Sequence, residues 1–486
     1  MTETHLPPRR KPLAARVGVF GVGLDIYWGQ FPGLLDTLLG YLDTFVAQVA
    51  AHGVDVTNFG IVDNAQAAYA LLPRLQAAEL DLVFVDMLTY ATSSTFGALI
   101  RALDVPVVLV ALQPLKRLDY AHATIEMQLK NDNICSLPEF AGVAVRMGRC
   151  VPPMIIGTLD DDPRAGAEIA TWCRIARVLH DLKRARIGHF GHPIEAMLDM
   201  HTDPTALTAA FGLHVVQTEL DDLVRLARAV TPEEITAKEA EILAMFDTPD
   251  PQADPLTRKL TAEDLASSAR MAVALDRFVA LYDLDGLAYY YKGEPGSERE
   301  HVAASLIVGN SLLCAQGFPM CGESDLKTAV AMLIMDRLEI GGSFAEFHPI
   351  DFEEDFILVG HDGPHHIAIA EGKPVLRSLT AYHGKPGSGA SVEFQLKEGP
   401  ITMLGVTSTF DVRFKFVIAE GESVAGPIPA TGNTNTRGVF RPDAVTFLKR
   451  WLAEGPTHHF ALGVGHHAEA LRQIAEVLGI EVAVVT

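Results

Sequence analysis

Short apolar runs alternate with helical repeats along the first part of the chain. Four runs of eight residues each are strand candidates, and the first of them, apolar and ending in glycines, is typical of a buried parallel strand. They cover residues 16–23, 54–61, 80–87 and 105–112. The stretches between them carry apolar residues at spacings of three and four, which indicates helices. This alternation predicts a doubly wound parallel sheet, whose ligands bind beyond the carboxyl ends of the strands.

The same alternation resumes after residue 150. Strand-like runs and helical repeats follow one another as far as residue 316. The expected strands cover residues 150–157, 184–191, 213–220 and 284–291, and the expected helices 165–182, 204–211, 261–282 and 301–316. We therefore expect a second α/β domain built on a parallel sheet.

The pattern changes after Phe344. Short strand-like runs separated by Gly, Pro and Asp turns predict antiparallel structure, in a small barrel or sandwich. These runs cover residues 356–360, 366–370, 392–396, 401–409 and 414–420, followed by strand 460–464, helix 468–478 and strand 480–485. The fold class predicted is α/β, with two Rossmann-like parallel-sheet domains followed by a C-terminal antiparallel β-barrel-like domain. The predicted domains are 1–158, 159–325 and 326–486.

Composition and charge narrow the functional classes. The chain has 486 residues and a formal net charge of -22. Nucleic acids and anionic membranes bind clustered Lys and Arg, so neither is expected as a partner. Five cysteines without a CxxC pair, no signal peptide and no membrane-length apolar run indicate a cytoplasmic protein with reduced thiols. The polar, proline-rich residues 1–12 are expected to form a loose arm.

Residues 317–361 carry the candidate chemistry. Glu323 and Glu346 stand in glycine-flanked settings, and a helical repeat over residues 325–338 separates them, with Ser324 as its expected N-cap. His361 ends an apolar run. Two carboxylates and an imidazole suit a divalent cation that keeps coordination positions free for substrate oxygens. We expect a metal site that performs chemistry.

Four motifs give the chain a family likeness. GESDLKTA at 322–329, GGSFAEF at 341–347, ILVGH at 357–361 and GVGHHAEAL at 463–471 resemble, in order and spacing, the metal-site motifs of the L-arabinose isomerase family. The wider group has the L-fucose/L-arabinose isomerase-like fold. The resemblance implies three domains of the kinds predicted above. It also implies Mn²⁺, with Co²⁺ or Mg²⁺ as alternatives, and a homo-oligomer, whether trimer, tetramer or hexamer.

Residue roles follow from the resemblance. Metal ligands would be Glu323, Glu346, His361 and one of the adjacent pair His466 and His467. We take His467 as that ligand. Glu323 and Glu346 would also be the catalytic proton-transfer pair, with the acid and the base not assigned between them. A second adjacent pair, 458–459, precedes a predicted strand and is expected to be structural.

These observations favour a metal-dependent aldose–ketose isomerase. Its substrate would be a free sugar, an L-arabinose-like pentose or a related one, which reacts through an enediol intermediate. Residues 133–140 contain no histidine where the family has one that contacts substrate, which indicates an altered sugar-reading surface. Two alternatives stay open: a metal-dependent isomerase or epimerase of another modified sugar, and a non-catalytic sugar-binding protein on the same fold.

Overall fold

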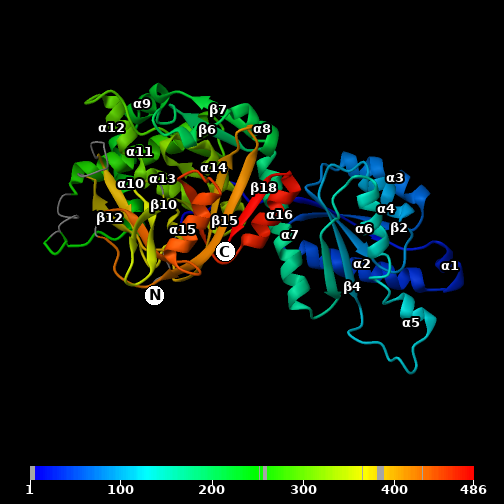
Figure 1. Cartoon of the computed structure of the whole chain (residues 1–486). Coiled ribbons are helices and arrows are strands. Elements are labelled where there is room, and N and C mark those ends of the chain that lie inside the picture. The colour runs from blue at the N-terminus through cyan, green and yellow to red at the C-terminus, as the bar shows by residue number, and fades with distance from the viewer. Residues whose placement is uncertain (1–5, 251, 255–259, 364, 380–387, 430) are drawn as a thin grey trace. The chain divides into compact units, whose positions relative to one another are not determined.

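The computed structural model describes residues 6–250, 252–254, 260–363, 365–379, 388–429 and 431–486 (Figure 1). By compactness the chain divides into two units. One unit is Leu13–Asp181, and the other joins Leu182–Thr486 to the N-terminal segment that ends at Pro12. The predicted division into three domains, with boundaries at 158 and 325, stays a prediction.

The unit Leu13–Asp181 is built on a five-stranded parallel sheet. Its strand order, β2-β1-β3-β4-β5, reverses direction at β1, as in a doubly wound fold. The strands are β1 (Arg16–Val22), β2 (Asp55–Val62), β3 (Leu82–Met87), β4 (Val107–Gln113) and β5 (Met154–Thr158). The helices are α1 (Ile26–Gln30), α2 (Leu34–Ala50), α3 (Ala65–Ala77), α4 (Ser94–Ile100), α5 (Ile125–Leu129), α6 (Leu137–Arg146) and α7 (Pro163–Leu182). The first predicted parallel sheet is confirmed.

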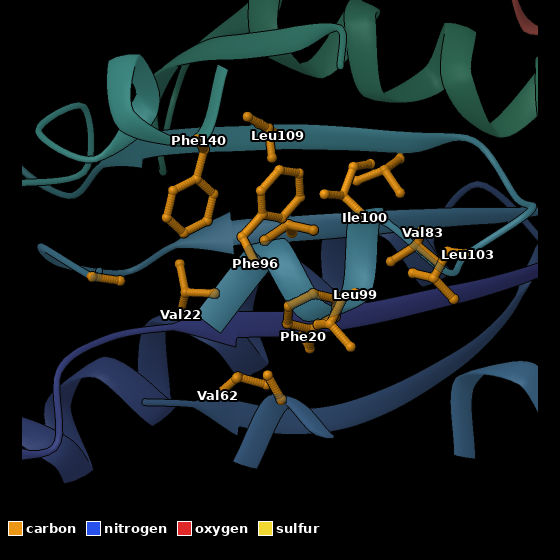
Figure 2. Packing of buried hydrophobic residues seen from close by; sticks show 14 of the residues in the cluster. Phe20, Val22, Val62, Val83, Phe96, Leu99, Ile100, Leu103, Leu109 and Phe140 are labelled. Atoms are coloured by element: carbon orange, nitrogen blue, oxygen red, sulfur yellow. The ribbon is translucent and has the colours of Figure 1, made fainter. Parts of the chain in front are cut away.

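Aromatic and branched side chains fill the space between this sheet and its helices. Figure 2 shows Phe96 of α4 and Phe140 of α6 in the same buried cluster as Phe20 and Val22 of β1. The rings of Phe96 and Phe140 stack with their centroids 4.7 Å apart. The central strands β1, β3 and β4 are buried on both faces, which explains why their sequences do not alternate.

One carboxyl group lies inside this sheet. Asp86 of β3 is 3% exposed, and its register neighbours are Gly21 of β1 and Val110 of β4. Burial raises the pKa of Asp86 to about 8. The side chain is therefore mostly protonated at pH 7 in the folded protein.

We expect Asp86→Asn to stabilise the protein at alkaline pH. In the unfolded chain an aspartate ionises near pH 4, while native Asp86 keeps its proton up to about pH 8. The stability due to protonated Asp86 is fully present below pH 4 and is lost as pH rises to 8. The substitution should remove this loss of stability with rising pH. At pH 8 it should raise the free energy of unfolding by several kcal/mol, at most about 5. Urea unfolding at pH 5 and pH 8 measures the free energy of unfolding, with the exposed Asp55→Asn variant as control. The expectation would be contradicted if the free energy of unfolding changed equally between pH 5 and pH 8 in wild type and in the Asp86 variant.

The second unit contains a four-stranded parallel sheet, in the order β7-β6-β8-β9. The strands are β6 (Arg186–Phe190), β7 (His214–Thr218), β8 (Gly286–Tyr289) and β9 (Met320–Cys321). Its helices are α8 (Pro204–Phe211), α9 (Leu220–Arg228), α10 (Pro232–Met245), α11 (Ala262–Leu281), α12 (Glu298–Ala304) and α13 (Ile307–Ala315). All of its strand pairs are parallel, so a second parallel sheet is confirmed. The strand expected at residues 150–157 instead forms β5 of the first sheet, because it pairs with β4, and β9 was not expected.

A six-stranded antiparallel barrel completes this unit. The order β14-β17-β10-β11-β16-β15 closes through a pairing of β15 with β14, and β18 adds to β15 in parallel. The barrel strands are β10 (Gly341–Asp351), β11 (Phe356–His361), β14 (Gly399–Ser408), β15 (Phe414–Val424), β16 (Thr434–Val439) and β17 (Phe460–Val464). Other elements are β12 (Val375–Ser378), β13 (Ala390–Glu393), α15 (Ala444–Ala453), α16 (Ala468–Leu478) and β18 (Glu481–Val485). The predicted fold class is thus confirmed.

Two local predictions in this region were wrong. The expected strand at residues 366–370 is a single 3₁₀ turn, Ile367–Ile369. Strand β10 was not expected, because its glycines Gly341 and Gly342 resemble a helix stop. Both have a φ near +100°, which lets the chain turn directly from the preceding helix into the strand.

Helix α14 (Leu326–Arg337) lies between the four-stranded sheet and the barrel. All of its residues are buried, and it contacts β6, β8 and β9 as well as β10, β14 and β17 (Figure 1). Its N-cap is Asp325, whose Oδ1 accepts the backbone N–H groups of Lys327 and Thr328 at 3.1 Å each. Ser324, the expected cap, instead has left-handed backbone with a φ of +57°.

The N-terminal segment is not a loose arm over the residues that the structure describes. Arg9 lies 2.5 Å from Asp336 of α14, and Lys11 lies 2.6 Å from Asp285. Asp336 is 4% exposed, so Arg9 compensates a buried carboxylate. The pKa of Asp336 is held far below its usual range despite burial, because His366, Arg9 and Arg337 surround it.

Among the described residues, no helix is long and apolar enough to cross a bilayer. The five cysteines are free, and Cys173, Cys314 and Cys321 are buried. Burial raises the pKa of the Cys173 and Cys314 thiols to about 12, which keeps them protonated and unreactive.

Candidate metal centre

A cavity of about 200 Å³ lies where β8, the N-terminal end of α14 and the barrel strands β10 and β11 meet. Its walls combine carboxylates, imidazoles and aromatic rings. They are Met197, Tyr289, Tyr291, Gly322, Glu323, Phe344, Glu346, His361, Asp362 and His458. Three of the four predicted site residues, the two glutamates and His361, therefore share one cavity.

Glu323 occupies the turn between β9 and α14. Its backbone is left-handed, with a φ of +60°, and Ser324 continues the same conformation. The Ser324 hydroxyl donates to the carbonyl of Phe190 at 2.9 Å, which ties the turn to β6. Left-handed non-glycine residues cost about 1 kcal/mol or more, and they concentrate at functional sites. The chain thus holds the Glu323 carboxylate at the cavity against a local conformational preference.

Glu346 reaches the same cavity from the opposite direction. The sequence placed the two glutamates beyond opposite ends of the helix. Helix α14 spans about 18 Å, and the five steps from Gly341 to Glu346 on β10 span about 17 Å in return. Because β10 packs against α14 and runs back along it, Glu346 returns to the end of the helix where Glu323 lies.

His361 stands beside Glu346 through the pairing of β10 with β11. Glu346 is in register with Gly360, the residue before His361. The Nε2 atom of His361 lies 3.8 Å from Oε1 of Glu346. Burial opposes protonation of His361, but its hydrogen bond with Asp362 and the charges of Asp362, Glu346 and Glu323 together raise its pKa to about 9. The cavity therefore has a negative potential that favours a cation.

His459 is a site residue that the sequence reasoning missed. It immediately precedes β17 and is fully buried. Its Nδ1 lies 3.2 Å from Asp325 Oδ2, and its Nε2 lies 3.7 Å from Glu323 Oε2. Its ring packs on Phe344, with the centroids 4.3 Å apart. The only sequence signal for His459 was its place in an adjacent pair of histidines next to a predicted strand, and such a pair was expected to be structural.

His467, the predicted fourth ligand, lies elsewhere. It precedes α16, beyond the far end of β17, and its backbone N–H donates to the Thr402 hydroxyl at 3.0 Å. The five residues of β17 put about 17 Å of strand between the two histidine pairs. Within the described ranges, His459 belongs to both groups of closely spaced potential ligands and His467 to neither. The structure thus brings His459, not His467, to the predicted site.

The potential ligands form two overlapping groups. One contains Glu346, His361 and His459, and the other contains Glu323, His458 and His459. Within each group the candidate ligand atoms lie within 4.8 Å of one another. His459 is the member that the two groups share, so it connects the two glutamates of the site.

Each of the three histidines has an acceptor at Nδ1. His361 Nδ1 lies 3.0 Å from the carbonyl oxygen of Asp362. His458 Nδ1 lies 2.6 Å from Asp199 Oδ2, and His459 Nδ1 faces Asp325. In a neutral imidazole, an acceptor at Nδ1 places the proton there and leaves the lone pair on Nε2, which is the usual arrangement of metal-binding histidines. His361 would have to lose its second proton when a cation binds.

The residues present fit a divalent cation. Glu323 Oε2 and His459 Nε2 are buried and make no hydrogen bond within the described part of the chain. Buried polar atoms without partners are costly, so an unpaired carboxylate oxygen facing an unpaired imidazole nitrogen points to a ligand between them. Mixed oxygen and nitrogen donors suit ions such as Mn²⁺ and Co²⁺.

Comparisons with known proteins agree with this geometry. Residues 341–481 match the L-arabinose isomerase C-terminal domain, a range that contains Glu346, His361 and His459. The L-arabinose isomerase of Nocardioides sp. (strain ATCC BAA-499 / JS614) is 27% identical over 408 residues, covering 82% of this chain and 79% of that protein. A solved C2-type ketoreductase from a modular polyketide synthase aligns over 64% of this chain and 80% of that chain with 12% identity, but its TM-score of 0.20 carries no structural argument.

Two further relatives give the same result over a shorter span. The L-arabinose isomerases of Klebsiella pneumoniae (strain 342) and Escherichia coli (strain K12) are 25% and 24% identical to the chain. Each alignment covers 67% of this chain and 65% of the relative. The domain match over the barrel and these alignments agree with the metal-site motifs and the fold, and the chain is similar to L-arabinose isomerases, as a divergent member of that family would be.

Proposed function

We propose that this chain is a metal-dependent aldose–ketose isomerase of a free sugar, an L-arabinose-like pentose or a related one. The observation that carries the proposal is that Glu323, Glu346 and His361 line one cavity of about 200 Å³, and that buried His459 shares a group of closely spaced potential ligands with each glutamate. The relatives named L-arabinose isomerase support the reaction class. We also propose a homo-oligomer, whether trimer, tetramer or hexamer, in the cytoplasm.

The four convergent side chains would hold the cation, with Mn²⁺ preferred and Co²⁺ or Mg²⁺ as alternatives. When bound, a divalent cation supplies stabilisation of the negative charge that develops on the sugar oxygens. The mixed donor set and the negative potential at His361 support this assignment.

The two glutamates would transfer the protons. Isomerisation moves a proton between adjacent carbons through an enediol, so one carboxylate must remove the carbon-bound proton. The second must handle the hydroxyl proton, and each transfer of this kind contributes about 10²–10⁴-fold to rate. Glu323 and Glu346 both reach the cavity. The acid and base roles are left open between them.

The remaining walls would orient the sugar. His458 borders the cavity, and its Nε2 can accept a hydrogen bond from a sugar hydroxyl because Nδ1 faces Asp199. Tyr289 and Tyr291 supply aromatic surface at the end of β8. Burial raises the pKa of Tyr291, and Glu323 and Asp362 raise it further, so its phenol stays protonated as a hydrogen-bond donor.

A ketose assay tests the proposal. A panel of aldoses is incubated with the protein in Mn²⁺, in EDTA, and in EDTA followed by excess Mn²⁺ or Co²⁺. We expect ketose to form with at least one pentose or hexose, to stop in EDTA and to return with the metal. Turnover that persists in EDTA would overturn the metal-dependent mechanism. Saturable sugar binding without turnover across the panel would favour a sugar-binding protein instead.

A further inference from the structure

We propose that Asp199 is a positioning residue that sets the direction of His458 toward the sugar. This inference rests on the isomerase proposed above. Asp199 belongs to the segment between β6 and α8, which also contributes Met197 to the cavity wall. It is 259 residues from His458 in sequence, so the fold itself brings the two together.

Two hydrogen bonds join the pair through one oxygen atom. Asp199 Oδ2 accepts the backbone N–H of His458 at 2.9 Å and lies 2.6 Å from its Nδ1. The first bond fixes the backbone of the segment before β17. The second fixes the ring and its tautomer, since an acceptor at Nδ1 leaves Nε2 as the acceptor of a ring that borders the cavity.

Asp199 is itself held from the other side. Its carbonyl oxygen accepts a hydrogen bond from Nζ of Lys327 at 2.7 Å. Lys327 is fully buried in the first turn of α14. The next residue, Met200, is 1% exposed and anchors the segment in the core. Asp199 is therefore held through its backbone carbonyl by the helix that follows Glu323 and through its carboxylate by the imidazole beside the cavity.

The arrangement parallels the one at the neighbouring histidine. Asp325 faces Nδ1 of fully buried His459, and Asp199 faces Nδ1 of His458. The side chains of Asp199 and His458 are 39% and 36% exposed, while those of Asp325 and His459 are fully buried. The buried pair suits an ion, and the more open pair suits a hydroxyl group that must enter and leave. Asp199 therefore acts on sugar affinity rather than on the cation.

The test compares Asp199→Ala and Asp199→Asn with wild type in the metal-loaded protein. One neutral hydrogen bond corresponds to a few-fold to about tenfold in affinity. We expect the alanine variant to raise KM by up to about tenfold with kcat changed less than about threefold. The asparagine variant should stay near wild type, because its amide oxygen still accepts from Nδ1. Glu195→Ala, an exposed acid of the same segment, is the matched control.

A double variant separates positioning from general damage. If Asp199 acts through His458, then Asp199→Ala combined with His458→Gln should have the same KM as His458→Gln alone. Independent, multiplicative losses would overturn the proposal, and so would wild-type KM in the alanine variant. Mn²⁺ affinity by titration calorimetry should be unchanged, and its loss would assign Asp199 to the metal centre instead. If wild type forms no ketose, the proposed function fails, and the same comparisons are made with sugar dissociation constants.

Discussion

Replacing Glu323 with glutamine should lower kcat by about 10²–10⁴-fold while the protein stays folded. Glutamine keeps the size and shape of the side chain but can neither accept the proton nor carry the charge. The left-handed turn that holds Glu323 is kept by the Ser324 bond to Phe190, which the substitution does not touch. Kinetics of ketose formation at saturating Mn²⁺ measure the effect, with circular dichroism to verify folding.

The chain supplies a matched control for this experiment. Glu339 is an exposed glutamate beyond the other end of α14, and its backbone is also left-handed, with a φ of +65°. Glu339→Gln should retain wild-type kcat, since it carries the same chemical change in the same conformation away from the cavity. A Glu323→Gln enzyme with kcat within threefold of wild type would show that this carboxylate transfers no proton.

Replacing His459 with glutamine should weaken Mn²⁺ binding by more than about 100-fold, while His467→Gln should leave it unchanged. Altering the residues that merely orient a metal ligand typically costs 10–100-fold in affinity, so loss of a ligand should cost more. His459 Nε2 faces Glu323, and His467 lies beyond the far end of β17. Titration calorimetry with Mn²⁺ measures both variants.

The opposite outcome has a clear meaning. If His467→Gln lost the metal and His459→Gln kept it, the assignment drawn from the GVGHHAEAL motif would be correct. His459→Gln also removes a buried ring that packs on Phe344, so its thermal stability in EDTA must be compared with wild type. His466→Gln provides an exposed histidine control beside His467.

The apolar pattern was enough to predict the two parallel sheets and the change to antiparallel strands after Phe344. The motifs of residues 322–361, rather than the apolar pattern, predicted that Glu323, Glu346 and His361 share one site. Neither the motifs nor the pattern could place His459, because strand direction decides which end of β17 faces the glutamates. His459 and His467 flank the same strand, and the sequence around them gives no direction. Strand β10 was missed because glycines with positive φ look like a break rather than an entry.

Long-range partners were beyond the reach of sequence patterns. Asp199 and His458 are joined by a hydrogen bond across more than half the chain, and neither stands in a motif. The burial of Lys327 could not be predicted either, because a charged side chain in a first helical turn is usually solvated. Its burial follows from α14 lying between two sheets, which depends on tertiary packing and not on the helix sequence.

The left-handed backbone of Glu323 would affect the outcome of directed evolution for heat resistance. Glycine adopts that conformation without penalty, so a mutation to glycine there would relieve strain and remove a charge from an acidic pocket. A library screened for heat resistance alone would therefore be enriched in robust, inactive clones at this codon. Selection must include sugar turnover in every round to keep the carboxylate.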